Sequence, residues 1–263
     1  MKKKLQGELR LILKQLSLFN AKYGEDDIRT CFLDGYFQTL KTYYCSYFHL
    51  ETAVFIAQVN EIYICEDIIK EDLAIHIQIH RNQLNSFLII NTWSNFEYCL
   101  SLFAEAVLSV SVKSELVAFE YNDIIHRLRG IDIPETQNER LLKLKRTNLA
   151  HVPMPLKYGK LFKMISSYPE QRSIKDDREF LDFYGKLRNC IHSNYIFFGN
   201  ENYEYTFGGV RFTFTPGKLI NTEPLFESSI FDLTKELKYV FMAIIGNIDC
   251  QDVIFDESVN LIY

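Results

Sequence analysis

Apolar residues recur every three or four positions through the first fifty residues, which is the spacing of one face of an α-helix. The first run covers residues 4–19, and its apolar face consists of Leu5, Leu9, Ile12, Leu16 and Phe19. Gly24 follows this run as a C-terminal stop, and a second helical run begins at Asp26 and Asp27 and continues to Tyr47. The pattern therefore predicts two amphipathic helices, over residues 4–19 and 26–47.

The sequence pattern of residues 51–80 fits both helix and strand. Residues 53–64 are rich in β-branched side chains and could pair as strands, whereas residues 62–79 also fit a helix. The pattern after this segment is clearer. Residues 83–112 predict one long, mostly buried helix, and residues 114–128, 176–192 and 228–245 predict three further helices. The buried stripe of the 176–192 helix is expected to consist of Phe180, Tyr184, Leu187 and Ile191.

Between the last two of these helices the chain changes to short aromatic and β-branched runs. These runs cover residues 195–198, 203–207, 210–215 and 218–220, with turn signals at 208–209 and 216–217. The expected fold is mainly α, a helical bundle with a small β-hairpin or meander inserted over residues 195–222 before the last helix. We expect an N-terminal helical part over residues 1–82, packed on the same core or semi-independent. A helical domain over residues 83–263 is expected to follow it.

Composition narrows the class of protein. The 263 residues are 48% hydrophobic and 14% aromatic, which excludes a disordered chain, and 11 Gly with 6 Pro exclude collagen-like and low-complexity chains. The six cysteines contain no Cys-x-x-Cys pair, so we expect them to be reduced. The first residues are too charged for a signal peptide and no apolar stretch is long enough to span a bilayer, so a soluble, cytoplasmic protein without membrane contacts is expected.

One short segment carries candidate chemistry: residues 187–194 read Leu-Arg-Asn-Cys-Ile-His-Ser-Asn. Arg188 and His192 stand four positions apart, so both side chains project from one side of a helix, one turn apart, at the flank of its buried stripe. A histidine can take or give a proton near neutral pH, and a guanidinium can hold a phosphate and stabilise charge on its oxygens. Metal-independent RNA cleavage requires both of these functions.

This segment resembles the HEPN superfamily (higher eukaryotes and prokaryotes nucleotide-binding domains). These are helical bundles whose late helix carries Arg, commonly Asn, and then His. Residues 95–100, Asn-Phe-Glu-Tyr-Cys-Leu, resemble the family's early helix, with Glu97 as an acidic residue that can face Arg188. The β segment after the motif is similar to the insertion of some members. The resemblance covers residues 83–247, and its specific part is eight residues long.

The resemblance implies a metal-independent endoribonuclease of the toxin or defence type, without a cofactor. Arg188, Asn189 and His192 are the expected catalytic residues, and Glu97 and Asn194 the supporting ones. The implied partners are a second copy of the chain, RNA, and an antitoxin or other defence partner. The family usually has four to six residues between Arg and His, whereas this chain has three. Two alternatives stay open: a non-catalytic HEPN-like dimerisation or nucleotide- or RNA-binding module, and a helical structural protein whose Arg188 and His192 pair with Glu97.

Two further groups of residues have both a structural and a functional interpretation. Residues 121–163 hold nine Lys and Arg against four acids, either as a solvated helix face with a loop or as a phosphate-contacting patch. The RNA-contacting residues would be Arg140, Lys143, Lys145 and Arg146. His76 and His80 are one helical turn apart, and Glu71 or Asp72 could complete a metal site. No His-Glu-x-x-His signature supports such a site, so no metal site is predicted.

Overall fold

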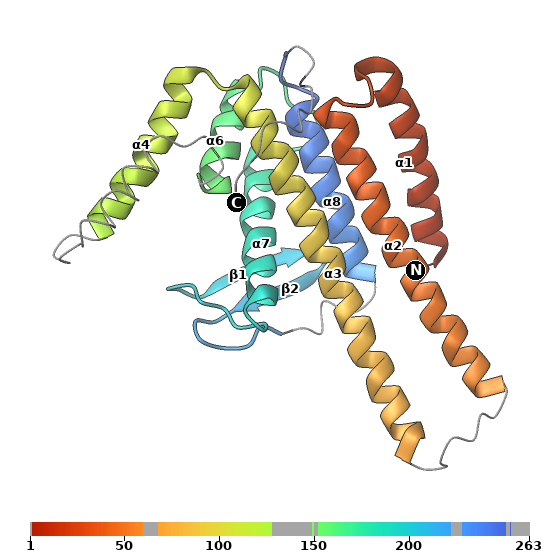
Figure 1. Ribbon diagram of the computed structural model, residues 1–263. Coiled ribbons are helices and arrows are strands. Elements are labelled where there is room, and N and C mark those ends of the chain that lie inside the picture. The colour runs from red at the N-terminus through yellow and green to blue at the C-terminus, as the bar shows by residue number, and fades with distance from the viewer. Residues whose placement is uncertain are drawn as a thin grey trace, which may run out of the picture.

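The computed structural model describes residues 2–59, 68–127, 149, 152–221, 228–250 and 253 (Figure 1). Within this part of the chain there are seven helices and one two-stranded sheet. The elements are α1 (Lys2–Tyr23), α2 (Ile28–Val59), α3 (Ile68–Val107), α4 (Val110–Arg127), α6 (Met154–Met164), α7 (Ile174–His192), β1 (Tyr203–Phe207), β2 (Val210–Phe214) and α8 (Ser228–Ile245). The predicted fold, mainly α with a small hairpin before the last helix, is confirmed.

The turn between α1 and α2 forms where the sequence places its stop signal. Gly24 has φ +90°, a left-handed conformation that favours glycine, and its N–H donates to the Asn20 carbonyl at 2.9 Å. Asp27 then caps α2, because its Oδ1 accepts from the Arg29 backbone N–H at 2.9 Å. Both helix boundaries follow from local chemistry, which is why the sequence predicts them.

The next two helices are much longer than predicted. The structure shows α2 continuing through Val59 over 32 residues and α3 beginning at Ile68 and running for 40, which corresponds to about 60 Å for α3. The strand alternative is therefore wrong for residues 51–59 and 68–80, while residues 60–67 lie outside the described part. Figure 1 shows the end of α2 and the start of α3 extending together past the other helices. Pairing of the two helices outweighs the strand preference of their β-branched residues.

The central element is α3, which packs against α2, α6, α7 and α8. Its predicted apolar face is buried: Trp93 stacks on Tyr184 of α7 with ring centroids 5.6 Å apart, and Phe96 meets Phe241 of α8 edge-on at 5.9 Å. Because α3 runs without a break through residues 82 and 83, the predicted division of the chain lies inside this helix. Side chains of α1 and α2 also belong to the same buried cluster as those of α7 and α8.

The downstream boundaries differ from the prediction in two places. The long helix ends at Val107 rather than at residue 112, because Ser109 starts a new helix by accepting from the Val112 backbone N–H at 3.4 Å. The helix α6 was not predicted. Pro153 is its N-cap and Pro155 lies in its first turn, and both are compatible with a helix start although they also signal a loop.

The β insertion is smaller than its four predicted runs. β1 and β2 pair antiparallel across Gly208 and Gly209, whose φ values of 56° and 80° suit a two-residue hairpin turn. The outer runs, over residues 195–198 and 218–220, form only an isolated bridge between Ile196 and Leu219 instead of regular strands. Aromatic side chains of the hairpin cover Phe183 of α7, with Tyr205 stacked on it at 4.4 Å. The insertion therefore covers the face of α7 on which Phe183 lies.

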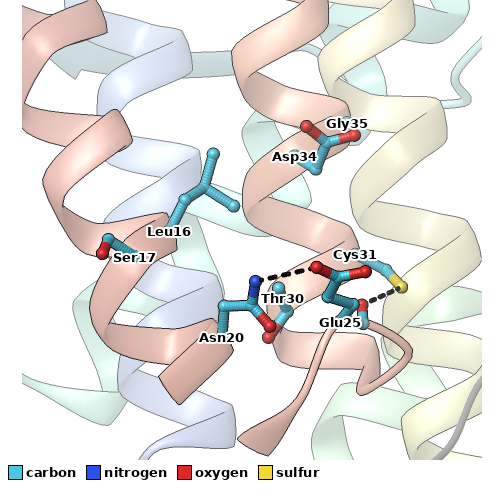
Figure 2. Close-up of a pocket in the computed structure, with 8 residues that line it drawn as sticks. All are labelled: Leu16, Ser17, Asn20, Glu25, Thr30, Cys31, Asp34 and Gly35. Atoms are coloured by element: carbon cyan, nitrogen blue, oxygen red, sulfur yellow. Dashed lines mark hydrogen bonds between the residues drawn. The ribbon is translucent and has the colours of Figure 1, made fainter. Parts of the chain in front are cut away.

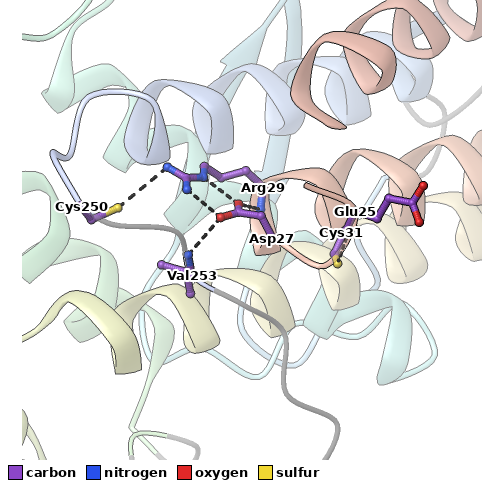
Figure 3. A network of polar contacts seen from close by, with 6 residues as sticks. All are labelled: Glu25, Asp27, Arg29, Cys31, Cys250 and Val253. Carbon is purple, nitrogen blue, oxygen red and sulfur yellow. Dashed lines mark hydrogen bonds and ion pairs between the residues drawn. The ribbon is translucent and has the colours of Figure 1, made fainter. Parts of the chain in front are cut away.

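Two ion pairs take part in contacts between segments that are distant in the sequence. Lys238 of α8 is fully buried and bonded to Glu8 of α1, and burial lowers the pKa of Lys238. Arg29 donates to Asp27 at 2.7 and 2.6 Å, and Asp27 also accepts from the Val253 backbone N–H at 3.0 Å (Figure 3). These contacts fix α1 and the start of α2 against the C-terminal segment. None of the described helices combines the length and the apolar composition needed to cross a bilayer.

Candidate functional site

A dense polar network fixes the N-terminal end of α7. The Ser173 hydroxyl accepts from the Asp176 backbone N–H at 3.4 Å. Arg172 donates to Asp177 at 2.9 and 2.6 Å and to Glu236 of α8 at 2.6 Å, and Tyr168 donates its hydroxyl to Asp177. Burial alone would lower the pKa of Arg172, but its hydrogen bonds to both carboxylates raise it. The start of α7 is thereby fixed to α8.

The C-terminal end of α7 closes with backbone contacts on either side of Asn194. The Ser193 N–H donates to the Asn189 carbonyl at 3.0 Å, and the Tyr195 N–H donates to the Cys190 carbonyl at 2.7 Å. Asn194 has φ 53°, the left-handed conformation that ends many helices and that asparagine tolerates better than most residues. Asn194 therefore has a structural role in ending α7, in addition to any supporting role in chemistry.

Arg188 meets Glu97 across the α3–α7 interface, as the sequence predicts. The Arg188 Nη2 atom lies 3.9 Å from Glu97 Oε2, and the two side chains are 28% and 41% exposed. Arg188 Nη1 donates to Asn189 Oδ1 at 3.1 Å, and its Nε atom is buried without a hydrogen-bond partner among the described residues. The guanidinium is therefore held loosely by Glu97 and Asn189, and its unpaired Nε is buried rather than open to solvent.

His192 is the last residue of α7 and is exposed, although its place at the flank of the stripe predicts half-exposure. Within the described part of the chain no hydrogen bond or ion pair joins it to Arg188 or to any other residue. Asn189 is likewise exposed, on the same end of the helix. The motif therefore presents a free imidazole one turn from a partly engaged guanidinium.

Cys190 lies between these residues but faces the core. Its side chain is buried, and burial raises the pKa of its thiol to about 11. A thiol with this pKa is almost entirely protonated near neutral pH, so it does not supply a nucleophile. The candidate chemistry of the segment therefore rests on Arg188 and His192.

A buried lysine is connected to the Glu97 backbone through Ser101, and the sequence pattern did not single it out. Lys157 of α6 is 2% exposed, and its Nζ donates to Ser101 Oγ at 2.9 Å, while Ser101 donates to the Glu97 carbonyl at 2.6 Å. Burial lowers the pKa of Lys157 to about 8, against the opposing charges of Glu97 and Glu105. Both readings of Lys157, as a solvated residue or as a phosphate contact, are therefore wrong. Its spacing from Met154, Tyr158 and Leu161 places it on their buried helix face, which is the signal that could have revealed it.

The remaining candidates are only partly within the described residues. Arg140, Lys143, Lys145 and Arg146, the proposed RNA contacts, lie outside them. Of the other basic residues of this segment, Lys160 pairs with Glu115 at 2.8 Å and Lys163 is exposed.

The possible metal ligands are also divided. His80 is exposed, whereas the side chains of Glu71, Asp72 and His76 lie outside the described part. Among the side chains that the structure describes, no group of three or more His, Cys, Asp or Glu is placed to hold a metal ion.

No protein-family model, curated protein or solved structure matches this chain. The functional interpretation therefore depends on the residues of this segment and on their geometry.

Proposed function

We propose that this chain is a HEPN-like, metal-independent endoribonuclease of the toxin or defence type, acting as a homodimer. The observation that carries the proposal is the exposed, unpartnered imidazole of His192, one helical turn from an Arg188 guanidinium that Glu97 orients. This pair supplies a proton acceptor and an anion-stabilising cation on one surface.

In the proposed reaction, His192 removes the proton of a ribose 2′-hydroxyl. The 2′-oxygen then attacks the adjacent phosphorus, and the bond from phosphorus to the 5′-oxygen of the next nucleotide breaks. The leaving 5′-oxygen takes a proton from an imidazolium. Arg188 donates hydrogen bonds to the phosphoryl oxygens, where negative charge increases in the transition state. The products are a 2′,3′-cyclic phosphate and a free 5′-hydroxyl.

The homodimer follows from the need for separate base and acid positions. A single His192 would have to take one proton and deliver another on opposite sides of the phosphorus. Two copies of the α7 end, related by a two-fold axis, provide two imidazoles and two guanidiniums around one phosphate. We therefore expect the 184–195 segment to lie in the dimer interface.

A second candidate is a HEPN-like module that binds RNA or nucleotide without cleaving it. Its supporting observation is that Arg188 is already engaged by Glu97 and Asn189 and is only partly exposed. The short Arg-to-His spacing also favours this alternative. In that case Arg188 contributes to binding, and His192 has no catalytic partner.

The test is an incubation of the purified protein with structured and unstructured RNAs, with and without EDTA. The ribonuclease proposal expects cleavage that survives EDTA, because side chains supply both proton transfer and charge stabilisation, and products that end in 2′,3′-cyclic phosphate. Arg188→Ala should lose cleavage and bind RNA more weakly, whereas Arg178→Ala, an exposed arginine on the same helix, should change neither. Cleavage abolished by EDTA would contradict the mechanism, and binding without cleavage would select the second candidate.

A further inference from the structure

A pocket of about 530 Å³ opens between α1 and α2, next to the turn that joins them. Figure 2 shows its lining residues, which come from the last turns of α1, the turn itself and the first turns of α2. They are Leu16, Ser17, Asn20, Glu25, Thr30, Cys31, Asp34 and Gly35. The volume is within the usual range for small-molecule sites, which is about 300–1,000 Å³.

The pocket carries negative charge without a matching cation. Its lining contains the carboxylates of Glu25 and Asp34 and no Lys or Arg. Neither carboxylate forms an ion pair within the described part of the chain; their contacts are amide hydrogen bonds, from Asn20 to Glu25 at 3.3 Å and from Gln38 to Asp34 at 3.2 Å. Each carboxylate can accept several hydrogen bonds, so most of this capacity is available to a ligand.

Thr30 provides an independent sign of a missing partner. Its side chain lines the pocket and is 6% exposed, yet Thr30 Oγ1 has no hydrogen-bond partner among the described residues. Buried hydroxyl groups are nearly always paired, because leaving one unpaired is destabilising. Oγ1 itself has almost no exposed surface, so a ligand N–H would satisfy it once the Thr30 side chain turns this oxygen toward the pocket.

The electrostatic potential at Cys31, in the wall of the pocket, is also negative. Burial raises the pKa of the Cys31 thiol, and the charges of Asp26, Asp27 and Asp34 raise it further. These carboxylates disfavour a second negative charge at this position and favour a positive one.

The walls of the pocket are fixed by contacts behind it. Gly35 allows α2 to approach α3 closely, since a Cβ there would lie 2.5 Å from Asn95 Oδ1, and Asn95 donates to the Phe32 carbonyl at 2.9 Å. On the turn side, Asp27 is bonded to Arg29 and to the Val253 backbone (Figure 3). A site with fixed walls loses little conformational entropy when a ligand binds.

We propose that this pocket binds a small organic dication, a diamine whose ammonium groups face Glu25 and Asp34 and whose N–H also satisfies Thr30. An ammonium group presents three N–H donors, which matches carboxylate, amide and hydroxyl oxygens better than it matches a metal site. The described residues hold no group of three carboxylate, imidazole or thiol ligands for a metal here. This site is separate from the α7 motif, so the proposal stands independently of the ribonuclease.

The test is calorimetric titration of the full chain with putrescine. The comparison ligands are 1,4-butanediol, which has the same length without charge, the α-acetylated amide of lysine, which presents one ammonium as a protein side chain would, and Mg²⁺. We expect saturable putrescine binding, weaker binding of the lysine amide because it carries one positive charge instead of two, and none of the diol. No saturable binding up to about 10 mM putrescine, which corresponds to less than 3 kcal/mol, would overturn the proposal. Equal or tighter binding of the diol, the lysine amide or Mg²⁺ would also overturn it.

Variants locate the site. Glu25→Gln and Asp34→Asn should each weaken putrescine binding about tenfold, because a hydrogen bond to a charged group is lost, and Thr30→Val should weaken it about fivefold. Glu201→Gln makes the same charge change at an exposed residue of the β insertion and should leave the affinity unchanged. An equal loss in Glu201→Gln would show non-specific attraction and overturn the site. Thermal unfolding without ligand shows that each variant is folded.

Discussion

The charged residues are tightly paired at the N-terminal end of α7 and only loosely paired at its C-terminal end. At the N-terminal end, Arg172, Asp177 and Glu236 form direct ion pairs at 2.6 Å, with Tyr168 as a further donor. At the C-terminal end, Arg188 lies 3.9 Å from Glu97, its Nε has no partner among the described residues, and His192 is exposed. This contrast supports the proposal that the N-terminal end of α7 serves stability and its C-terminal end serves function.

The largest effect on stability is expected at the N-terminal end. Asp177→Ala leaves the partly buried Tyr168 without its acceptor and leaves Arg172 with Glu236 alone, so the free energy of unfolding should fall by about 2–4 kcal/mol. Urea denaturation measures this loss. Asp176→Ala, at the neighbouring exposed position, should change the free energy of unfolding by less than about 1 kcal/mol. Equal effects of the two substitutions would show that the buried network adds no stability.

Substitution of Lys157 should have the next largest effect on the free energy of unfolding, and this effect should depend on pH. Its pKa of about 8 in the folded chain lies below the ordinary value of 10.5, so the unfolded chain binds more protons between these pH values. The contribution of Lys157 to the free energy of unfolding therefore rises from pH 8 to pH 10.5 and is unfavourable below pH 8. Lys157→Met should raise the free energy of unfolding at pH 7 by up to about 3 kcal/mol.

The difference in unfolding free energy between Lys157→Met and the wild type isolates this group from the tyrosines and cysteines that titrate in the same range. It should shrink as the pH rises from 8 to 10.5. Lys163→Met, an exposed lysine of the same helix, should show no such trend. A difference that stays constant with pH would contradict the depressed pKa of Lys157.

The substitution Glu97→Gln tests the contact between Glu97 and Arg188 at the C-terminal end of α7. The exposed pair at 3.9 Å should contribute less than about 1 kcal/mol to the free energy of unfolding. Cleavage should nevertheless fall about tenfold, because the Arg188 guanidinium loses an orienting partner. The rate on a single RNA substrate and the unfolding free energy are measured on the same sample. An unchanged rate in this variant, with Arg188→Ala inactive, would show that Glu97 does not position Arg188.

Asn194→Gly should have the smallest effect. Glycine adopts the left-handed conformation of residue 194 without a Cβ penalty, so the free energy of unfolding should rise by between about 0 and 1 kcal/mol. Cleavage should be unchanged if Asn194 acts only in ending the helix. A clear loss of cleavage, measured against the wild type, would assign its side chain to the reaction.

Local patterns explain which parts of the structure were predictable. The Gly24 stop, the 208–209 turn and the apolar stripe of α7 follow from neighbouring residues. The Glu97–Arg188 contact is the one that the resemblance of the two helix segments implies. The buried state of Lys157 and its bond to Ser101 connect positions 56 residues apart, and the Glu8–Lys238 pair connects positions 230 apart. Such contacts depend on how helices pack in three dimensions, which spacing along one helix does not specify.

The most direct comparison measures the rate of RNA cleavage and the free energy of unfolding in His192→Ala and Asp177→Ala side by side. His192→Ala should lose about 10²–10⁴-fold in rate, as expected for removal of a general acid or base, with an almost unchanged unfolding free energy. Asp177→Ala should lose stability but retain its rate per folded molecule. Full activity in His192→Ala, or a loss of rate confined to Asp177→Ala, would contradict the assignment of function to the C-terminal end of α7.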